Sequence, residues 1–313
     1  MYIRKGISGS SGGINITYNW TSPVLQPDVN TVLLLHFDNR SEFRENESLV
    51  YDFSGYGNNA TCKKGIDCPN LSFSNSKFAG AFEYNGTANS FFNVSDSNSL
   101  DLTSKGTVAA WIYARKLPQA TQQAMIVGKH SGTATSAISY QLYLNDDGTI
   151  SGLISNSVAL DTVSTSAISL NSYYHVVFTW NSTNISIYLD SVLGQASPQT
   201  VNAGISAFDL LIGRTIGSGA FNGTIDEIAI YNMSLSLNEI QNHFRLKEGK
   251  YFWQVNASDG VSTTKSSVFE FVSDVTKPKI NASLNNSAPK RGEIVNMTAN
   301  VSDEIGLSFC QFI

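Results

Sequence analysis

Short runs of alternating apolar and polar residues fill this chain, and turn-forming residues separate them. Thr31–Phe37, Gly106–Tyr113, Tyr173–Trp180 and Asp226–Tyr231 are typical, because each is rich in Val, Ile, Tyr, Phe or Trp and is followed by turn residues. Runs of this kind predict β-strands. About ten of them over roughly 215 residues predict an all-β fold built as a two-sheet sandwich. One short helix is expected where Ser236 and Glu239 have the spacing of a capping box.

Composition excludes two classes of function. Charged residues make up 14% of the chain and the net charge is −5, so no basic surface for nucleic acid is expected. No window of about 20 apolar residues occurs, so we expect no membrane span in this stretch. The first residues lead into a Gly/Ser run rather than an apolar signal core. We therefore expect a piece of a longer secreted chain.

Asn-X-Ser/Thr triplets, the acceptor sites of N-linked glycans, are unusually dense. The 29 Asn and 64 Ser or Thr among 313 residues would give roughly six by chance, and the sequence has 17. We expect N-linked glycans on an extracellular surface. The candidate acceptors are Asn15, Asn19, Asn39, Asn46, Asn59, Asn70, Asn85, Asn93, Asn181, Asn184, Asn222, Asn232, Asn256, Asn281, Asn285, Asn296 and Asn300. For the Asn-Gly pairs at 85 and 222, a tight turn is the alternative explanation.

The triplets within strand-like runs also predict orientation. In a strand, residues i and i+2 share a face and i+1 points the other way. In 184–190 this pattern directs Ile185, Ile187 and Leu189 into the core and Asn184 to the solvent. The same reasoning applied to 295–301 directs Val295, Met297, Ala299 and Val301 inward.

Three cysteines indicate an oxidising environment. Cys62 and Cys68 flank a five-residue loop, and we predict a disulfide between them, with two free thiols as the alternative. Cys310 has no obvious partner and is expected to pair with a cysteine outside this sequence.

Five motifs in order across residues 31–246 resemble the laminin-G-like, concanavalin A-like jelly-roll family. They are Leu33–Asp38, Asp52–Thr61, Gly106–Ile112, Tyr174–Trp180 with Ile187–Asp190, and Phe221–Asn232, with a trailing helix at Leu235–Ile240. Ser191 stands where the family pattern has Gly. The resemblance implies a jelly-roll fold; it implies little about function, because this fold serves lectins, enzymes and spacers.

The remaining segments resemble parts of smaller β modules. Residues 1–30 are expected to be a strand or linker, 247–276 resemble the last strands of a fibronectin-III-like domain, and 277–313 the first half of an immunoglobulin-like domain. One interpretation is insertion: Gly13–Trp20 supplies a strand to the module that resumes at 249. The alternative is an independent hairpin.

Asp226 is the most informative carboxylate. Strict alternation places it on the face of Ile228 and Ile230, and burying an ionised carboxylate without a partner is costly. The family resemblance implies a structural Ca²⁺ there, with Asp38 as a second ligand. The alternative is that Asp226 caps a turn through backbone N–H groups.

No enzyme activity is expected. Glycoside hydrolysis needs two carboxyls flanking one bond. Asp226 and Glu227 are adjacent, so alternation directs them to opposite faces, and the pair Asp146-Asp147 lies in a turn. The four histidines are scattered, and no phosphate loop or nucleophile elbow is present.

The sequence thus predicts a non-enzymatic, N-glycosylated extracellular protein, better suited to an archaeal surface than to a bacterial one. The leading hypothesis is a structural or adhesion subunit of a surface layer or filament, assembling with copies of itself or neighbouring surface proteins through β-strand edges. The alternatives are a calcium-dependent module that binds glycan or protein, and an accessory domain of a larger secreted enzyme.

Overall fold

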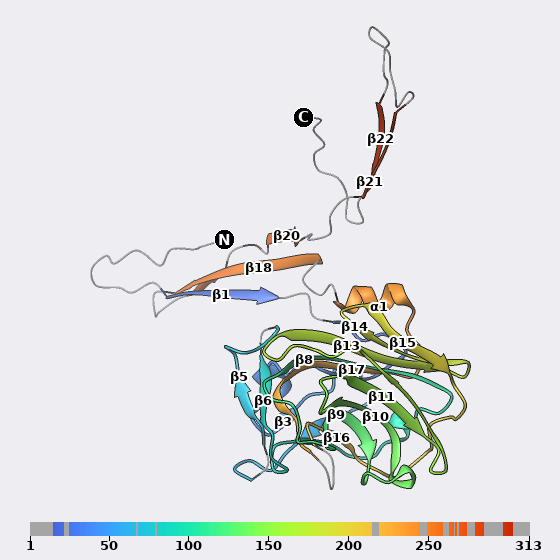
Figure 1. Ribbon diagram of the computed structural model, residues 1–313. Coiled ribbons are helices and arrows are strands. Elements are labelled where there is room, and N and C mark those ends of the chain that lie inside the picture. The colour runs from blue at the N-terminus through green and yellow to red at the C-terminus, as the bar shows by residue number, and fades with distance from the viewer. Residues whose placement is uncertain are drawn as a thin grey trace. The chain divides into compact units, whose positions relative to one another are not determined.

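The computed structural model describes residues 15–21, 25–66, 68–78, 80–214, 219–244, 249–258, 263–265, 267, 269–273, 279–284 and 297–302 (Figure 1). The chain divides into two compact units: residues 24–244, here the sandwich unit, and residues 1–23 with 245–313, here the split unit. Side chains are described in the sandwich unit. The predictions for Cys310, for the acceptors Asn285 and Asn296, and for the inward-facing side chains of 295–301 fall outside the described residues.

The split unit contains strands from both ends of the chain. Its strands are β1 (Asn15–Thr21), β18 (Gly249–Ser258), β19 (Thr263–Lys265), β20 (Phe269–Ser273), β21 (Lys279–Leu284) and β22 (Met297–Ser302). β1 pairs antiparallel with β18 from Asn15 opposite Ser258 to Thr21 opposite Phe252. The chain therefore leaves this unit before the sandwich and returns to it afterwards. The fibronectin-like and immunoglobulin-like identities of 247–276 and 277–313 stay predictions.

Two eight-stranded sheets form the sandwich unit, and their strand pairs in the described residues are all antiparallel. The β17 sheet runs in the order β15 (Val192–Pro198), β14 (Asn184–Leu189), β13 (Tyr173–Asn181), β8 (Lys105–Ala114), β17 (Asn222–Tyr231), β6 (Ala81–Asn85) and β5 (Asn70–Ser72), with β2 (Thr31–Leu35) also on β17. The β10 sheet runs β12 (Leu160–Ser164), β11 (Ile150–Ser155), β10 (Ile138–Asn145), β9 (Gln123–His130), β16 (Leu210–Ile212), β7 (Phe92–Val94), β4 (Ala60–Thr61) and β3 (Leu49–Val50). This arrangement confirms the predicted two-sheet jelly roll.

Apolar side chains from both sheets fill the space between them. The largest fully buried side chains include Trp180 and Phe178 from β13 and Tyr140 from β10. The sheets approach closely at Gly152 of β11, where a Cβ would lie 2.2 Å from the Phe178 ring. Ile185 and Ile187 of β14 are buried and Asn184 is exposed, as alternation predicted.

A smaller apolar cluster covers the opposite face of the β17 sheet, here its outer face. It combines Leu34, Ala109, Val177 and Ala229 with Ile240 of the helix α1 (Leu237–Phe244). The capping box is present at the start of α1. The Ser236 N–H donates to Glu239 Oε2 (2.6 Å), and the Glu239 N–H reaches Ser236 Oγ (3.4 Å). In the described part of the chain, no helix has the length and apolarity to cross a membrane.

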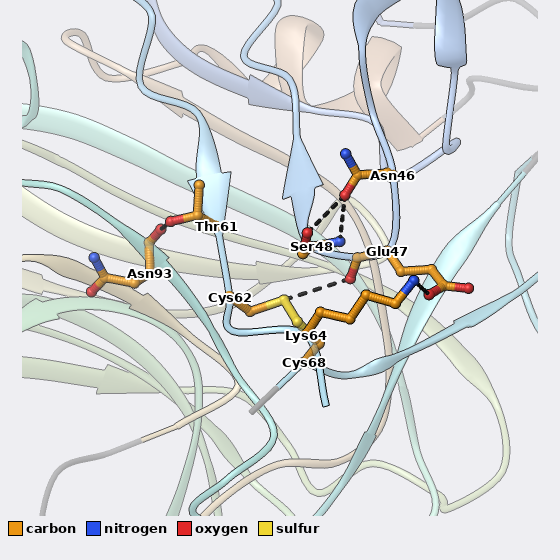
Figure 2. The surroundings of a disulfide bond; sticks show 8 residues. All are labelled: Asn46, Glu47, Ser48, Thr61, Cys62, Lys64, Cys68 and Asn93. Carbon is orange, nitrogen blue, oxygen red and sulfur yellow. Dashed lines mark hydrogen bonds and ion pairs between the residues drawn. A yellow bond between two sulfur atoms is a disulfide. The ribbon is translucent and has the colours of Figure 1, made fainter. Parts of the chain in front are cut away.

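Connections between strands include the 3-10 helices η1 (Ser41–Phe43), η2 (Asn98–Leu100) and η3 (Thr135–Ala137), and one disulfide. Cys62 and Cys68 are bonded, with their Cα atoms 5.1 Å apart, as predicted (Figure 2). The bridge lies between β4 of the β10 sheet and β5 of the β17 sheet. It therefore closes the loop by which the chain passes from one sheet to the other.

Candidate functional site

A pocket of about 240 Å³ lies where β6 and β8 end and β17 begins. Three segments form it: the turn after β6, the loop after β8 and the residues that lead into β17. Its lining residues are Asn85, Gly86, Ala88, Lys116, Leu117, Pro118, Gln119, Gln122, Gly219, Ala220 and Asn222. Amide side chains and small apolar groups dominate this lining, and none of its described residues is a carboxylate.

One wall is an Asn-Gly turn, as the sequence indicated. Asn85 Oδ1 accepts hydrogen bonds from the Thr87 N–H (3.0 Å) and hydroxyl (2.7 Å), and Gly86 has a φ of +77°. A Cβ on Gly86 would lie 2.9 Å from Asn222 Nδ2, which itself donates to the Asn85 carbonyl at 3.1 Å. Gly86 thus has both a conformational and a steric reason to be glycine.

The opposite wall is the loop 115–122, which backbone bonds hold in place. The Arg115 N–H donates to the Asn222 carbonyl (2.9 Å), and the Gln122 N–H to the Gln119 carbonyl (2.9 Å). Among the described residues, the side chains of Lys116, Gln119 and Gln122 have no hydrogen-bond or ion-pair partner. The loop is therefore ordered while its polar side chains stay available to a ligand.

A row of directly opposed residues continues from the pocket across the outer face of the β17 sheet. Glu83 of β6 lies opposite Thr224 of β17, Thr224 opposite Tyr113 of β8, and Tyr113 opposite Tyr173 of β13. The Tyr113 and Tyr173 rings are 5.1 Å apart. Arg115 pairs with Glu83 at 2.9 Å. This row adds aromatic surface and a charged pair beside the pocket.

The charge of Glu83 is stabilised by its neighbours. Partial burial opposes ionisation, but hydrogen bonds from Asn75 and Ser72 and the Arg115 guanidinium hold the pKa of Glu83 below its ordinary value. Asn75 Nδ2 donates to Glu83 Oε1 at 2.7 Å, and the Tyr173 hydroxyl donates to the Asn75 carbonyl at 2.6 Å. The row is thus an ionised, cross-linked network with fixed geometry.

The two predicted metal ligands hold one backbone segment. Asp226 Oδ2 accepts the N–H groups of Lys77 (2.9 Å) and Phe78 (3.1 Å), and Asp38 Oδ1 accepts that of Gly80 (3.1 Å). Burial and the nearby Glu227 raise the pKa of Asp226 well above its usual value. Asp226 Oδ1 is buried without a partner, which favours a cation, but no group of three metal-ligating side chains occurs among the described residues. Calcium stays a prediction.

The expected orientation of Asp226 and Glu227 is wrong, because β17 contains a β-bulge. Pairing with β8 shifts by one residue between Asp226 and Ala229, and Glu227 has a φ of +49°. Ile225 and Ile228 therefore both face the core, while Asp226 lies opposite Trp111. Glu227 also contacts the outer face, where its Oε2 lies 2.8 Å from His36 Nδ1. Both acids are enclosed, at 0% and 3% exposure, so burial keeps them from a substrate.

The acceptor asparagines divide by exposure. Asn46, Asn70, Asn85, Asn181 and Asn184 are exposed; Asn39, Asn59, Asn93, Asn222 and Asn232 are partly buried. The side chains of Asn15, Asn19, Asn256, Asn281 and Asn300 lie outside the described set. Thr224, the hydroxyl residue of the Asn222 triplet, is fully buried. Glycosylation of any of them stays a prediction.

Sequence reasoning did not identify the pocket. Lys116, Gln119 and Gln122 stand in an ordinary polar loop, and no motif distinguishes them from other loop residues. A turn was the alternative explanation for the Asn-Gly pairs at 85 and 222; the first pair does begin a turn, but the second lies in β17, so that alternative is wrong there. Nothing in the sequence brings the two pairs together. That follows only from the pairing of β6 with β17.

Comparison with known proteins identifies the fold family. The family model described as the concanavalin A-like lectin/glucanases superfamily matches residues 85–241, half of the chain. The chain belongs to this superfamily. No curated protein matches it.

Several solved structures share the superfamily's sandwich. The binding domain of Paraclostridial Mosquitocidal Protein 1 is 14% identical with a TM-score of 0.55, over 86% of this chain and 75% of that one. The receptor-binding domain of botulinum neurotoxin type G is 16% identical with a TM-score of 0.51, over 70% of this chain and 52% of that one. Domain 4 of AbnA, a GH43 extracellular arabinanase from Geobacillus stearothermophilus, in complex with arabinotriose, is 16% identical with a TM-score of 0.50, over 68% of this chain and 97% of that one.

These likenesses extend to the fold alone. The chain spans about half the length of the botulinum neurotoxin domain. Two of these three structures are binding domains and the third is a domain of an arabinanase, which is compatible with a non-enzymatic protein.

Proposed function

We propose that this protein is an extracellular, non-catalytic carbohydrate-binding module, and that its pocket at the end of β8 receives one sugar unit of a glycan. The observation that carries the proposal is the set of polar side chains on the loop 115–122 that have no partner among the described residues. Lys116, Gln119 and Gln122 all line the pocket, where each can bond a ligand.

The lining matches the chemistry of a sugar ring. A sugar presents hydroxyl groups, which both donate and accept hydrogen bonds, around a less polar ring face. The amides of Gln119 and Gln122 provide donors and acceptors, and Lys116 provides donors. Leu117, Pro118 and Ala220 offer apolar surface to the ring. Binding sites combine these two elements: apolar contact for affinity and a few placed polar groups for orientation.

The volume limits what can enter. Pockets that enclose drug-sized ligands measure about 300–1,000 Å³, and this one is about 240 Å³. We therefore propose that a single terminal or side-branch unit binds in it, while further units lie along the row of Glu83, Tyr113 and Tyr173. Aromatic rings on such a surface are suited to contact with sugar faces.

Two further observations support the proposal. The disulfide between Cys62 and Cys68 is typical of proteins outside the cytoplasm. The similar structures include an arabinanase domain in complex with arabinotriose and a botulinum neurotoxin DC binding domain in complex with SialylT. What those proteins bind is theirs; the likeness makes a saccharide the first ligand to test here.

The test is a glycan array probed with the full chain, followed by titration calorimetry on any hit. Both neutral pentose and hexose oligomers and acidic, sialylated glycans belong on the array, because the described residues of the lining include one cation and no carboxylate. The double variant Gln119→Ala/Gln122→Ala should weaken binding of the hit at least tenfold, corresponding to the loss of about two hydrogen bonds.

A matched control uses an exposed amide elsewhere. Asn98 lies in η2, before the start of β8, whereas the pocket lies beyond the end of β8. Asn98→Ala should therefore bind the saccharide as the wild type does. An array with no hit contradicts the proposal. Binding that survives the double variant would place the ligand elsewhere on the surface.

A structural role in a surface assembly is the second candidate, and one observation favours it. β15 ends the β17 sheet and exposes Val192 (68%) and Leu193 (51%). An exposed apolar edge strand is able to pair with another chain. Sedimentation of the full chain over a concentration series should then show oligomers that Leu193→Lys abolishes and that Val158→Lys, in the β11–β12 turn, leaves unchanged. A monomer at every concentration would count against assembly through this edge.

A further inference from the structure

Lys129 occupies an unusual place for a charged residue. It lies in β9 opposite Tyr140 of β10 and Leu210 of β16, both of which belong to the core between the sheets. Its side chain is 0% exposed, and it is among the largest fully buried side chains. A lysine is rarely fully buried unless its amine is paired, so its partners decide what it does.

Two carboxylates hold the amine. Lys129 Nζ contacts Asp96 Oδ1, and Asp101 Oδ1 lies 3.2 Å away on the same nitrogen. Both acids belong to the segment between β7 and β8. The Asp96 N–H donates to Asp209 Oδ1 (3.0 Å), and the Asp101 N–H to the Asn98 carbonyl (3.3 Å), so both backbones are fixed. The Lys129 amine, the carboxyl carbon of Asp96 and the Asp101 carboxylate therefore lie close together.

We propose that Lys129 and Asp96 form an intramolecular isopeptide bond, with Asp101 as the proton acceptor. A pre-positioned amine and carboxyl react as an effectively unimolecular pair, which removes much of the entropic barrier to amide formation. The surroundings favour the product as well. Charges buried beside Leu100 and Tyr140 pay a desolvation cost that a neutral amide does not.

Amide formation between Lys129 and Asp96 releases one water and needs no oxidant or reductant. Within the contact, the ammonium passes one proton to the Asp96 carboxylate, which gives an amine and a carboxylic acid. The nitrogen lone pair forms the N–C bond to Asp96 Cγ, and Asp101 accepts the proton that the nitrogen then releases. Asp101 returns this proton to the leaving oxygen, the C–O bond breaks, and one water departs. The Asp96 side chain is 35% exposed, so the water has a route to solvent.

Mass spectrometry tests the bond directly and independently of any carbohydrate ligand. The full chain, made in cells that add no N-glycans, folded and then reduced, should weigh about 18 Da less than its sequence, because one water is lost. Trypsin should then leave residues 78–105 joined to residues 117–214, with no cleavage after Lys129. A folded wild type with the full sequence mass and a linear Lys129 peptide overturns the proposal.

Two variants separate the covalent bond from the ion pair. Lys129→Arg keeps the positive charge beside Asp96 and Asp101 but has no amine that can form the amide, so it should show the full mass, remain folded and unfold at a lower temperature than the wild type. Asp101→Asn should fold and also keep the full mass. If Asp101→Asn still loses water, Asp101 is not the proton acceptor. If Lys129→Arg unfolds at the wild-type temperature, the contact contributes no covalent stabilisation.

Discussion

The pocket at the end of β8 and the outer face around Asp226 present polar side chains in opposite circumstances, although both lie on the β17 sheet. In the pocket, Gln119 and Gln122 reach solvent and have no partner in the described part of the chain. On the outer face, Asp226 is 0% exposed and accepts hydrogen bonds from the backbone N–H groups of Lys77 and Phe78. The first arrangement leaves bonding capacity for a ligand, and the second uses it to hold a segment in place. Substitutions should therefore affect binding in one region and folding in the other.

The largest effect is expected at Asp226. Asp226→Ala leaves the Lys77 and Phe78 N–H groups without their acceptor and opens a small cavity, so it should lower the free energy of unfolding by about 2–4 kcal/mol. Urea denaturation followed by fluorescence measures this. Asp226→Asn is the matched control, because its amide oxygen still accepts both bonds. A loss as large in Asp226→Asn as in Asp226→Ala would show that charge, not the bonded oxygen, is what matters there.

Two buried histidines, His175 of β13 and His243 of α1, should make folding sensitive to acid. Burial lowers the pKa of His175 to about 3 and that of His243 to about 4. Near pH 6.5 the unfolded chain binds protons at these two histidines and the folded chain does not. The free energy of unfolding is therefore highest at neutral pH with respect to these groups, and it falls as the pH drops from about 6.5 toward their folded-state pKa values.

His175→Phe isolates one of these groups. Its ring packs 5.1 Å from Trp111, so an aromatic replacement is tolerated sterically. Between pH 7 and pH 4 the wild type should lose about 1–3 kcal/mol more stability than the variant. The measurement is the urea midpoint across that pH range. Parallel pH profiles for the two proteins would show that His175 does not contribute to the loss of stability in acid.

Calcium should have a conditional effect on stability. If Asp226 and Asp38 hold the ion, calcium at 100 times its dissociation constant stabilises the fold by about 2.7 kcal/mol at most, and chelation removes that amount. Thermal unfolding with calcium or EDTA should therefore differ for the wild type and coincide for Asp226→Asn. An equal midpoint with and without the ion in the wild type would leave the backbone N–H groups as the sole partners of these carboxylates.

Both regions contain features that the sequence could not predict, although much of the fold around them could be predicted. The strands, the capping box at Ser236 and the disulfide follow from local patterns, because alternation and spacing are properties of neighbouring residues. The orientation of Asp226 was missed because a one-residue bulge leaves no local signature yet reverses the faces that alternation assigns. The pocket was missed for a related reason: Asn85 and Asn222 are 137 residues apart in sequence and meet only through the register of β6 on β17. The buried contact of Lys129 with Asp96 and Asp101 also depends on long-range packing, and composition gives no hint of it.

The smallest effect on stability is expected in the pocket. Gln122→Ala removes a side chain that has no partner among the residues the structure describes, so the free energy of unfolding of this variant should stay within about 0.5 kcal/mol of the wild type. Gln122→Ala should nevertheless weaken binding of whichever saccharide the array identifies. A stable protein with reduced affinity is the opposite of the result expected for Asp226→Ala, in which folding suffers first. If Gln122→Ala instead unfolds as readily as Asp226→Ala, the Gln122 side chain stabilises the fold. In that case its hydrogen-bonding groups are not free for a ligand, and the proposed binding role of Gln122 is wrong.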